Sequence, residues 1–298
     1  MEKKHVRTAY LKMHLAIFLW GFTGLLGKLI ELDQVVLVWY RMLISSAAIL
    51  FILLYNKKFP KLSWRETLKI ALIGIIVMLH WVTFYGSIKL ASISVAMICL
   101  SSIALFASIF EPLVNKQKFD YVEILFSGLA VTGITTIYKS DVSASTGIFL
   151  GVFSALLSAI FSVFNKKITS KYESLTISFI ELSSGFLFLS ILLPFYSYSF
   201  PEITIKATVS DFIYLLILSL FCTVLTWILS LQALRKVSAF TMGLALNLEP
   251  VYGITLAILF AGESKHMNSG FITGAVIIFL TIILHTLYKF RFKRTISS

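Results

Sequence analysis

Apolar residues fill long runs of the sequence that are separated by short polar connections. Each run holds roughly 18 to 23 residues, and at about 1.5 Å of rise per residue such a helix crosses a hydrocarbon core of roughly 30 Å. The pattern therefore predicts membrane-spanning helices. Ten runs follow one another, at residues 13–30, 35–55, 68–88, 94–110, 121–138, 146–165, 175–196, 212–234, 239–260 and 268–288.

Composition agrees with a lipid-facing chain. Of the 298 residues, 58% are hydrophobic and 13% are charged, whereas soluble domains carry about 25% charged residues. The longest connection, residues 197–211, has 15 residues, so we expect no soluble domain outside the membrane. The first run is long for a signal peptide and lacks an A-x-A-like cleavage site, so we interpret it as the first spanning helix.

The basic residues predict an orientation. The formal net charge is +12, but the lysines and arginines crowd the ends of the apolar runs, which favours a role in topology over nucleic-acid binding. If ten helices alternate from a cytoplasmic N-terminus, 20 of the 26 basic residues fall on the cytoplasmic side and 5 outside, and Arg41 lies within the second helix. This predicts a multi-pass protein of the cytoplasmic (inner) membrane with both termini cytoplasmic.

The two halves of the sequence resemble each other weakly, at offsets that drift from 139 to 146 residues. A unit of five helices present twice must enter the membrane from opposite sides, which places a substrate site near mid-membrane between the units. The predicted fold is thus an all-α integral membrane protein of ten transmembrane helices, built as two inverted five-helix repeats at residues 1–140 and 141–298. The matched segments are 16–28 with 155–167, 39–41 with 179–181, 89–92 with 235–238, and Gly128 with Gly274.

Three short motifs carry a family resemblance: Tyr40-Arg41 in the second helix, Leu-Asn-Leu-Glu-Pro-Val at residues 246–251, and Gly262-Glu263 followed by Gly270 and Gly274. With these motifs the chain resembles the EamA family of the drug/metabolite transporter superfamily. The resemblance implies two five-helix repeats and the export or exchange of small metabolites, such as amino acids, by alternating access. No particular substrate carries over.

One departure from two-fold symmetry matters for the site. At the offset of 146 residues, Glu249 and Pro250 should have counterparts in the fourth helix, but Ile103 and Ala104 stand there. We therefore do not expect both units to contribute the same side chains to the site.

Charged residues inside membrane helices usually face a cavity or a partner, because inserting one costs about 2.5–3.5 kcal/mol. The clear cases are Arg41, Glu181 and Glu249. The guanidinium of Arg41 matches a substrate carboxylate, and the alternative is a structural ion pair with Glu181 or Glu249. Either glutamate could take up a proton, or Glu181 could be purely structural.

Glu249 lies beside Asn247 and directly before Pro250. The proline ring removes the hydrogen bond to the carbonyl of Leu246 and predicts a kink of the ninth helix that exposes backbone acceptors. Together with the Glu249 carboxylate, the kink could bind a substrate ammonium group. The alternative is that the kink only shapes the helix bundle.

Further pathway candidates are histidines and aromatic residues. His80 and His285 could relay protons, or form structural hydrogen bonds between helices. Aromatic rings away from the helix ends could line the pathway and stack on a substrate, or simply pack in the core. The rings in question are Trp20, Trp81, Tyr85 and Trp227.

Other classes of protein fit the sequence less well. All four aspartates fall in connections and no catalytic pair or metal-ligand cluster is visible, so we predict no enzyme, no cofactor and no metal. We predict a secondary transporter of a small solute. A small-solute channel or facilitator, or a membrane receptor or scaffold, remains an alternative, and a homodimer stays open.

The ten-helix topology predicts that both ends of the chain lie on the cytoplasmic side of the membrane. Tags or single cysteines placed at the two ends should react only with membrane-permeant reagents in intact cells. Labelling of the two ends from opposite sides would contradict the odd-numbered repeat.

Overall fold

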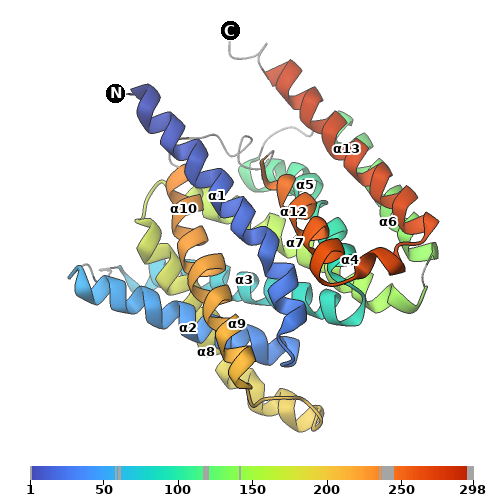
Figure 1. Ribbon diagram of the computed structural model, residues 1–298. Coiled ribbons are helices and arrows are strands. Elements are labelled where there is room, and N and C mark those ends of the chain that lie inside the picture. The colour runs from blue at the N-terminus through green and yellow to red at the C-terminus, as the bar shows by residue number, and fades with distance from the viewer. Residues whose placement is uncertain are drawn as a thin grey trace.

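The computed structural model describes residues 2–57, 59, 62–116, 121–140, 142–234, 236 and 245–293. The described chain is helical almost throughout (Figure 1). Three short elements, η1 (Val142–Ala144), the π-helical η2 (Leu220–Leu225) and η3 (Glu263–His266), join or interrupt the longer helices. The α-helices are α1 (Glu2–Leu29), α2 (Gln34–Tyr55), α3 (Trp64–Leu90), α4 (Ile93–Leu100), α5 (Ile103–Asn115), α6 (Tyr121–Ser140), α7 (Ser145–Ile168), α8 (Ser174–Ser199), α9 (Val209–Ser219), α10 (Thr226–Leu234), α12 (Leu248–Phe260) and α13 (Ser269–Lys293).

The predicted all-helical membrane fold is confirmed. Among the described residues, seven helices or helix pairs are long and apolar enough to cross a membrane, and two shorter apolar helices lie at residues 248–260 and 269–285. With α6 these elements correspond to the ten predicted runs, and residues 239–244 of the ninth run lie outside the described residues. Large apolar side chains such as Phe51, Phe149 and Leu187 are exposed on the surface of the bundle, as expected for residues that contact lipid.

The helices pack with a pseudo-two-fold pattern that relates the two units. Helix α1 packs on α10 and α12, and its equivalent α7 packs on α3 and on the α4–α5 pair. A pseudo-two-fold axis between the units exchanges the two members of three further packed pairs. These pairs are α2 with α8, α4 with α12, and α6 with α13. The main packing partners of each helix thus come from the other unit, so the units interlock instead of forming two separate bundles.

Two spans are interrupted at equivalent positions. The fourth is divided into α4 and α5 by Ser101 and Ser102. In the ninth, Asn247 separates helical residues 245–246 from α12, and Ser101 and Asn247 differ by the offset of 146 residues that relates the units. Pro250 therefore lies in the first turn of α12, where its missing N–H leaves no bond unmade, and the interruption precedes it by three residues.

Helices α6 and α13 form a pair at one side of the bundle (Figure 1). A Cβ added to Gly274 would lie 2.6 Å from the carbonyl oxygen of Gly133, and one added to Gly133 would lie 2.9 Å from that of Gly274. The two backbones thus approach closely through small residues, as in many membrane helix pairs. Gly270 and Gly274, which belong to the motifs of the family resemblance, lie where α13 packs closely on α6, against Ser140 and Gly133 respectively.

Glu263 joins the second unit to the first. Gly262 adopts a positive φ of 67°, which glycine allows without strain, and places Glu263 at the N-terminus of α4. Its carboxylate accepts hydrogen bonds from the backbone of Ile93 at 2.7 Å and of Ser94 at 2.9 Å, and from the Ser94 hydroxyl at 2.6 Å. The buried N-terminus of α4 is thereby capped by a residue from the opposite unit.

A larger residue at Gly274 should separate the α6–α13 pair. We expect Gly274→Leu to destabilise the protein by about 1–3 kcal/mol, because the added side chain meets the backbone of Gly133. Thermal unfolding in detergent measures the change. The control is Gly128→Leu on α6, where an added Cβ meets no atom within 4 Å, and equal loss of stability in both variants would show that the close approach is not what matters.

Candidate functional site

Arg41 lies on α2 in the centre of the bundle, with only 2% of its surface exposed. Its Nε donates a hydrogen bond of 2.8 Å to Oγ1 of Thr223 in η2, and its Nη1 donates one of 2.8 Å to the hydroxyl of Tyr85 on α3. Its guanidinium carbon lies 3.7 Å above the centre of the Trp81 ring. Side chains of both units therefore hold the guanidinium in one orientation.

The partners of Arg41 are neutral. In the part of the chain that the structure describes, the one ion pair is Lys166 with Glu111, and it lies on other helices. The predicted alternative of an Arg41 ion pair with Glu181 or Glu249 is therefore not found. Two hydrogen bonds use two of the five N–H donors of a guanidinium, so three donors remain for a further acceptor.

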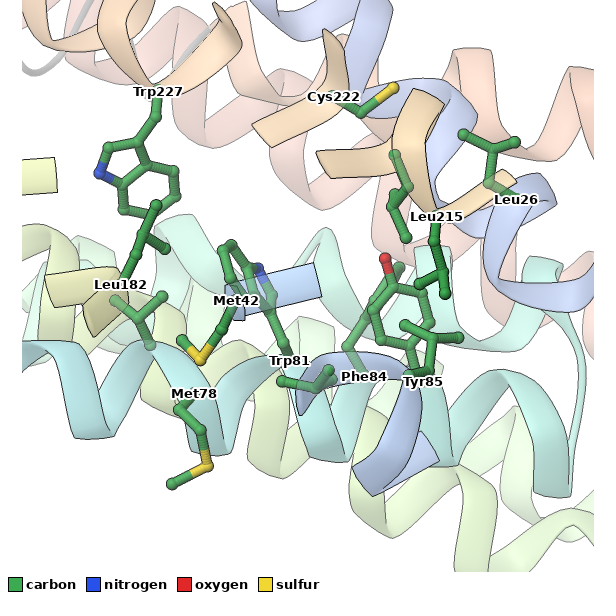
Figure 2. Packing of buried hydrophobic residues seen from close by; sticks show 14 of the residues in the cluster. Leu26, Met42, Met78, Trp81, Phe84, Tyr85, Leu182, Leu215, Cys222 and Trp227 are labelled. Atoms are coloured by element: carbon green, nitrogen blue, oxygen red, sulfur yellow. The ribbon is translucent and has the colours of Figure 1, made fainter. Parts of the chain in front are cut away.

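Trp81 and Trp227 connect Arg41 with Glu181. The two indole rings lie between α3 and α10 (Figure 2), 5.9 Å apart in an edge-to-face arrangement. The indole N–H of Trp227 donates a hydrogen bond of 3.2 Å to Oε2 of Glu181 on α8. We call Arg41, Trp81, Tyr85, Thr223, Trp227 and Glu181 the central cluster.

The central cluster depends on the local π-helix of η2. There the Thr223 hydroxyl donates a 2.8 Å hydrogen bond to the carbonyl of Leu218, five residues earlier, which matches the wider turn of a π-helix. The hydroxyl oxygen is then available to accept from Arg41. Such π-helical turns in membrane helices often occur at functional sites.

Glu249 lies near Arg41 on another helix, α12, and Asn247 directly precedes that helix. Glu249 occupies the first turn of α12, and its carboxyl group and the Arg41 guanidinium attract each other electrostatically without forming an ion pair. The Asn247 side chain makes no capping hydrogen bond to α12. Both side chains are half-buried, so they remain available to a solute.

The other predicted residues lie outside the central cluster. His80 is buried on α3, where Nδ1 lies 2.8 Å from the hydroxyl and 2.9 Å from the carbonyl oxygen of Ser154 on α7, which is the structural arrangement considered above. His285 lies on α13 with its ring edge-to-face against Phe126 of α6, 5.4 Å away. Trp20 packs against the apolar core from α1.

Sequence reasoning missed two polar residues of the site. Thr223 lies in an apolar run and differs from a lipid-facing threonine only through the π-helical turn. Asn165 lies near the end of α7, beside Glu181, and is 5% exposed. A polar amide at the last position of the apolar run 146–165 was the available signal, and its position next to two lysines concealed it.

A pocket of about 570 Å³ opens on the face that carries the α1–α2 connection. Lys89 in its wall lies one turn of α3 beyond Tyr85, and Asp33 lies two turns of α2 before Arg41. The pocket thus lies on the same two helices as the central cluster. Its other lining residues are Glu31, Leu32, Gln34, Ser199, Phe200, Pro201, Glu202, Ile203 and Thr204.

A polar cluster enclosed by two interlocked five-helix units defines a membrane transporter of the inverted-repeat class. The model of the EamA-like transporter family matches the chain twice, at residues 7–139 and 145–287. The chain therefore belongs to the EamA-like transporter family, which consists of transporters and not enzymes. Membership implies a small-molecule substrate and a multi-pass membrane location.

Individual relatives agree with this assignment. The uncharacterized transporter YxxF of Bacillus subtilis is 21% identical over all of this chain and 95% of its own length. An uncharacterized transporter of Archaeoglobus fulgidus is 22% identical over 57% of this chain and 61% of its own length. A crystal structure covering 95% of this chain and 98% of its own chain has a TM-score of 0.64 at 14% identity, which supports the fold.

Removing the Thr223 hydroxyl should weaken the hold on Arg41. We expect Thr223→Val to lower the free energy of unfolding by about 1–3 kcal/mol, because Nε of the buried guanidinium loses its acceptor. Thermal unfolding in detergent measures the loss. The matched control is Thr255→Val, because the exposed Thr255 hydroxyl bonds only within its own helix. A Thr223→Val variant as stable as this control would contradict the role of Thr223.

Proposed function

We propose that this protein is a secondary transporter that exports or exchanges a small metabolite across the cytoplasmic membrane by alternating access. The observation that carries the proposal is the buried Arg41 guanidinium, which contacts both units and has no anionic partner within ion-pair distance among the described residues. A permanently charged group in this position is costly unless an anion joins it. We infer that the anion is supplied by the substrate.

The chemistry around Arg41 favours a carboxylate or a group of similar shape. A guanidinium with its planar face on Trp81 and two donors already committed presents its remaining donors along an edge, which suits bidentate binding. Glu249, half-buried on α12, is placed to attract a cationic group of the same solute. A small zwitterionic metabolite such as an amino acid fits both charges.

Alternating access is supported by the packing. Arg41 bonds to Tyr85 of its own unit and to Thr223 of the other, so a solute at this site lies on the boundary where the units would shift. The pocket beside Asp33 and Lys89 provides a vestibule on one face. The excess of basic residues at the opposite helix ends favours placing this vestibule outside the cell.

The alternatives of a channel and of a receptor make different predictions. A channel would give single-channel currents, a carrier or facilitator would give saturable flux, and a receptor would bind a solute without moving it. The interlocked packing of the two units around an enclosed charge favours a carrier over either. Saturable flux with exchange across the membrane indicates a carrier, single-channel currents indicate a channel, and binding without flux indicates a receptor.

Transport by the purified protein tests the proposal. Liposomes containing the protein are loaded with a labelled panel of amino acids, carboxylic acids and amines, and efflux is measured. We expect saturable efflux of a solute that carries a carboxylate. In Arg41→Lys, loss of the bidentate edge should raise KM for that solute about tenfold to hundredfold, because a charge-assisted hydrogen bond is lost.

The control is Lys28→Ala, which removes an exposed basic residue near the end of α1 and should leave KM unchanged. Thermal unfolding of Arg41→Lys shows whether the variant is folded. An unchanged KM in a folded Arg41→Lys protein would show that the substrate does not bind Arg41, and the absence of any saturable efflux across the panel would refute the transport proposal.

A further inference from the structure

Glu181 and Asn165 form a second polar site, separate from the Arg41 guanidinium. We propose that this pair binds and releases the proton that couples transport to a proton gradient. The inference rests on the proposed transport function and goes beyond it by naming the coupling ion and its site. Its basis is the number of donors and acceptors in the pair.

The pair is enclosed and short of hydrogen-bond donors. Glu181 is fully buried, and Asn165 is 95% buried. Oε2 of Glu181 accepts from Trp227, but Oε1 of Glu181 and Oδ1 of Asn165 have no hydrogen-bond partner among the described residues. The Asn165 amide lies against the Glu181 carboxyl group with an N–H that can donate to its ionised form. The two buried oxygens that still lack a donor are unusual in a folded protein and call for a ligand that donates.

One proton satisfies both acceptors. A proton on Oε1 converts the carboxylate into an acid whose O–H can donate to Oδ1 of Asn165, so each atom gains a partner. When the proton leaves, the amide of Asn165 can turn over and donate from Nδ2 to the carboxylate. The amide therefore provides a partner for both protonation states of Glu181.

A metal ion fits the pair less well than a proton. Hard cations take about six oxygen ligands, and one oxygen of Glu181 is already bound to an indole N–H. The Ser184 hydroxyl next along α8 donates to the carbonyls of Ala71 and Glu181. In the part of the chain that the structure describes, two side-chain oxygens without a hydrogen bond therefore lie together. Two oxygens are enough to hold a proton and too few to coordinate a metal ion.

Titratable groups on the surrounding helices do not form an ion pair with Glu181. No cation lies within ion-pair distance of its carboxyl group among the described residues. Lys166 and Lys167, next to Asn165, bond instead to Glu111 and to the carbonyl of Val114 on α5. Within the membrane, the helices packed on α7 and α8 also carry Tyr40 and Arg41 on α2, His80 and Tyr85 on α3, and Cys99 on α4.

Trp227 and Trp81 provide the connection to the substrate site. Trp227 donates to the Glu181 carboxyl group and packs edge-to-face on Trp81, which lies under the Arg41 guanidinium. An ionised Glu181 binds the Trp227 N–H more strongly than a protonated one does. Proton release from Glu181 therefore strengthens the hydrogen bond of Trp227, whose ring packs against Trp81 beneath Arg41.

Infrared spectroscopy tests the proton site without a transported substrate. Difference spectra of the purified protein between acidic and alkaline buffer should contain the carbonyl band of a buried carboxylic acid. We expect Glu181→Gln to abolish this band and Glu249→Gln, the control for another membrane carboxyl group, to retain it. Asn165→Leu should move the band to higher wavenumber, because the acid loses its acceptor.

The outcomes separate this proposal from the transport function. A band that persists in Glu181→Gln, or that is absent from the wild type, overturns the proton site even if transport is found. Once a solute is transported, the ratio of efflux with and without a pH gradient should fall to about one in Glu181→Gln. A ratio equal to that of the wild type also overturns the proposal, and Glu181→Asp, which keeps a carboxyl group, should restore the band.

Discussion

The structure depends on the lack of water in the membrane interior, because every backbone N–H and C=O there must find a partner within the protein. Long helices satisfy this requirement by themselves, and their ends and interruptions need help. At the interruption between α4 and α5, the hydroxyls of Ser101 and Ser102 donate to the carbonyls of Met97 and Cys99. The other end of α4 is capped by Glu263. The break between α4 and α5 therefore occurs where serine hydroxyls supply additional hydrogen bonds to helix carbonyls.

The same requirement applies to the charge in the centre of the bundle. Arg41 is surrounded by a hydroxyl from each unit and by an aromatic face, which satisfy part of its hydrogen-bonding capacity and none of its charge. A buried ion pair would have fixed the guanidinium permanently. Neutral partners hold it in place and leave its charge for a solute, so the arrangement suits a site that must be alternately filled and emptied.

Much of the fold could be predicted from the sequence, because membrane thickness fixes the length of an apolar run and lipid excludes polar residues from it. Hydropathy could not reveal that serines 101 and 102 interrupt a span, since small polar residues are tolerated inside membrane helices. Arg41 and Glu181 were identifiable as rare charges in apolar runs. Of their neutral partners, Trp81, Tyr85 and Trp227 were identifiable as aromatic rings away from the helix ends. Thr223 was not, because it becomes an acceptor for Arg41 only through a π-helical turn that no residue pattern predicts.

The site also shows why residue type alone is a weak predictor of the role of a residue. His80 has the chemistry of a proton carrier, but Ser154 occupies its Nδ1 from the facing helix. Pro250 has the chemistry of a helix breaker, yet it lies in the first turn of α12, after the interruption at Asn247. In both cases the packing partner or the position along the helix determines the role of the residue, and neither follows from the residue type.

The capping of α4 by Glu263 has a mechanical consequence. If the start of α4 moved away from η3, the Glu263 carboxylate would lose its three hydrogen-bond donors and the backbone amides of Ile93 and Ser94 would lose their acceptor. Each buried group left without a partner costs about 1–3 kcal/mol of free energy. The two segments should therefore travel together during a transport cycle. Each group of helices that moves as a rigid body would then contain helices of both repeats. The two sequence repeats would not correspond to the moving parts of the transporter.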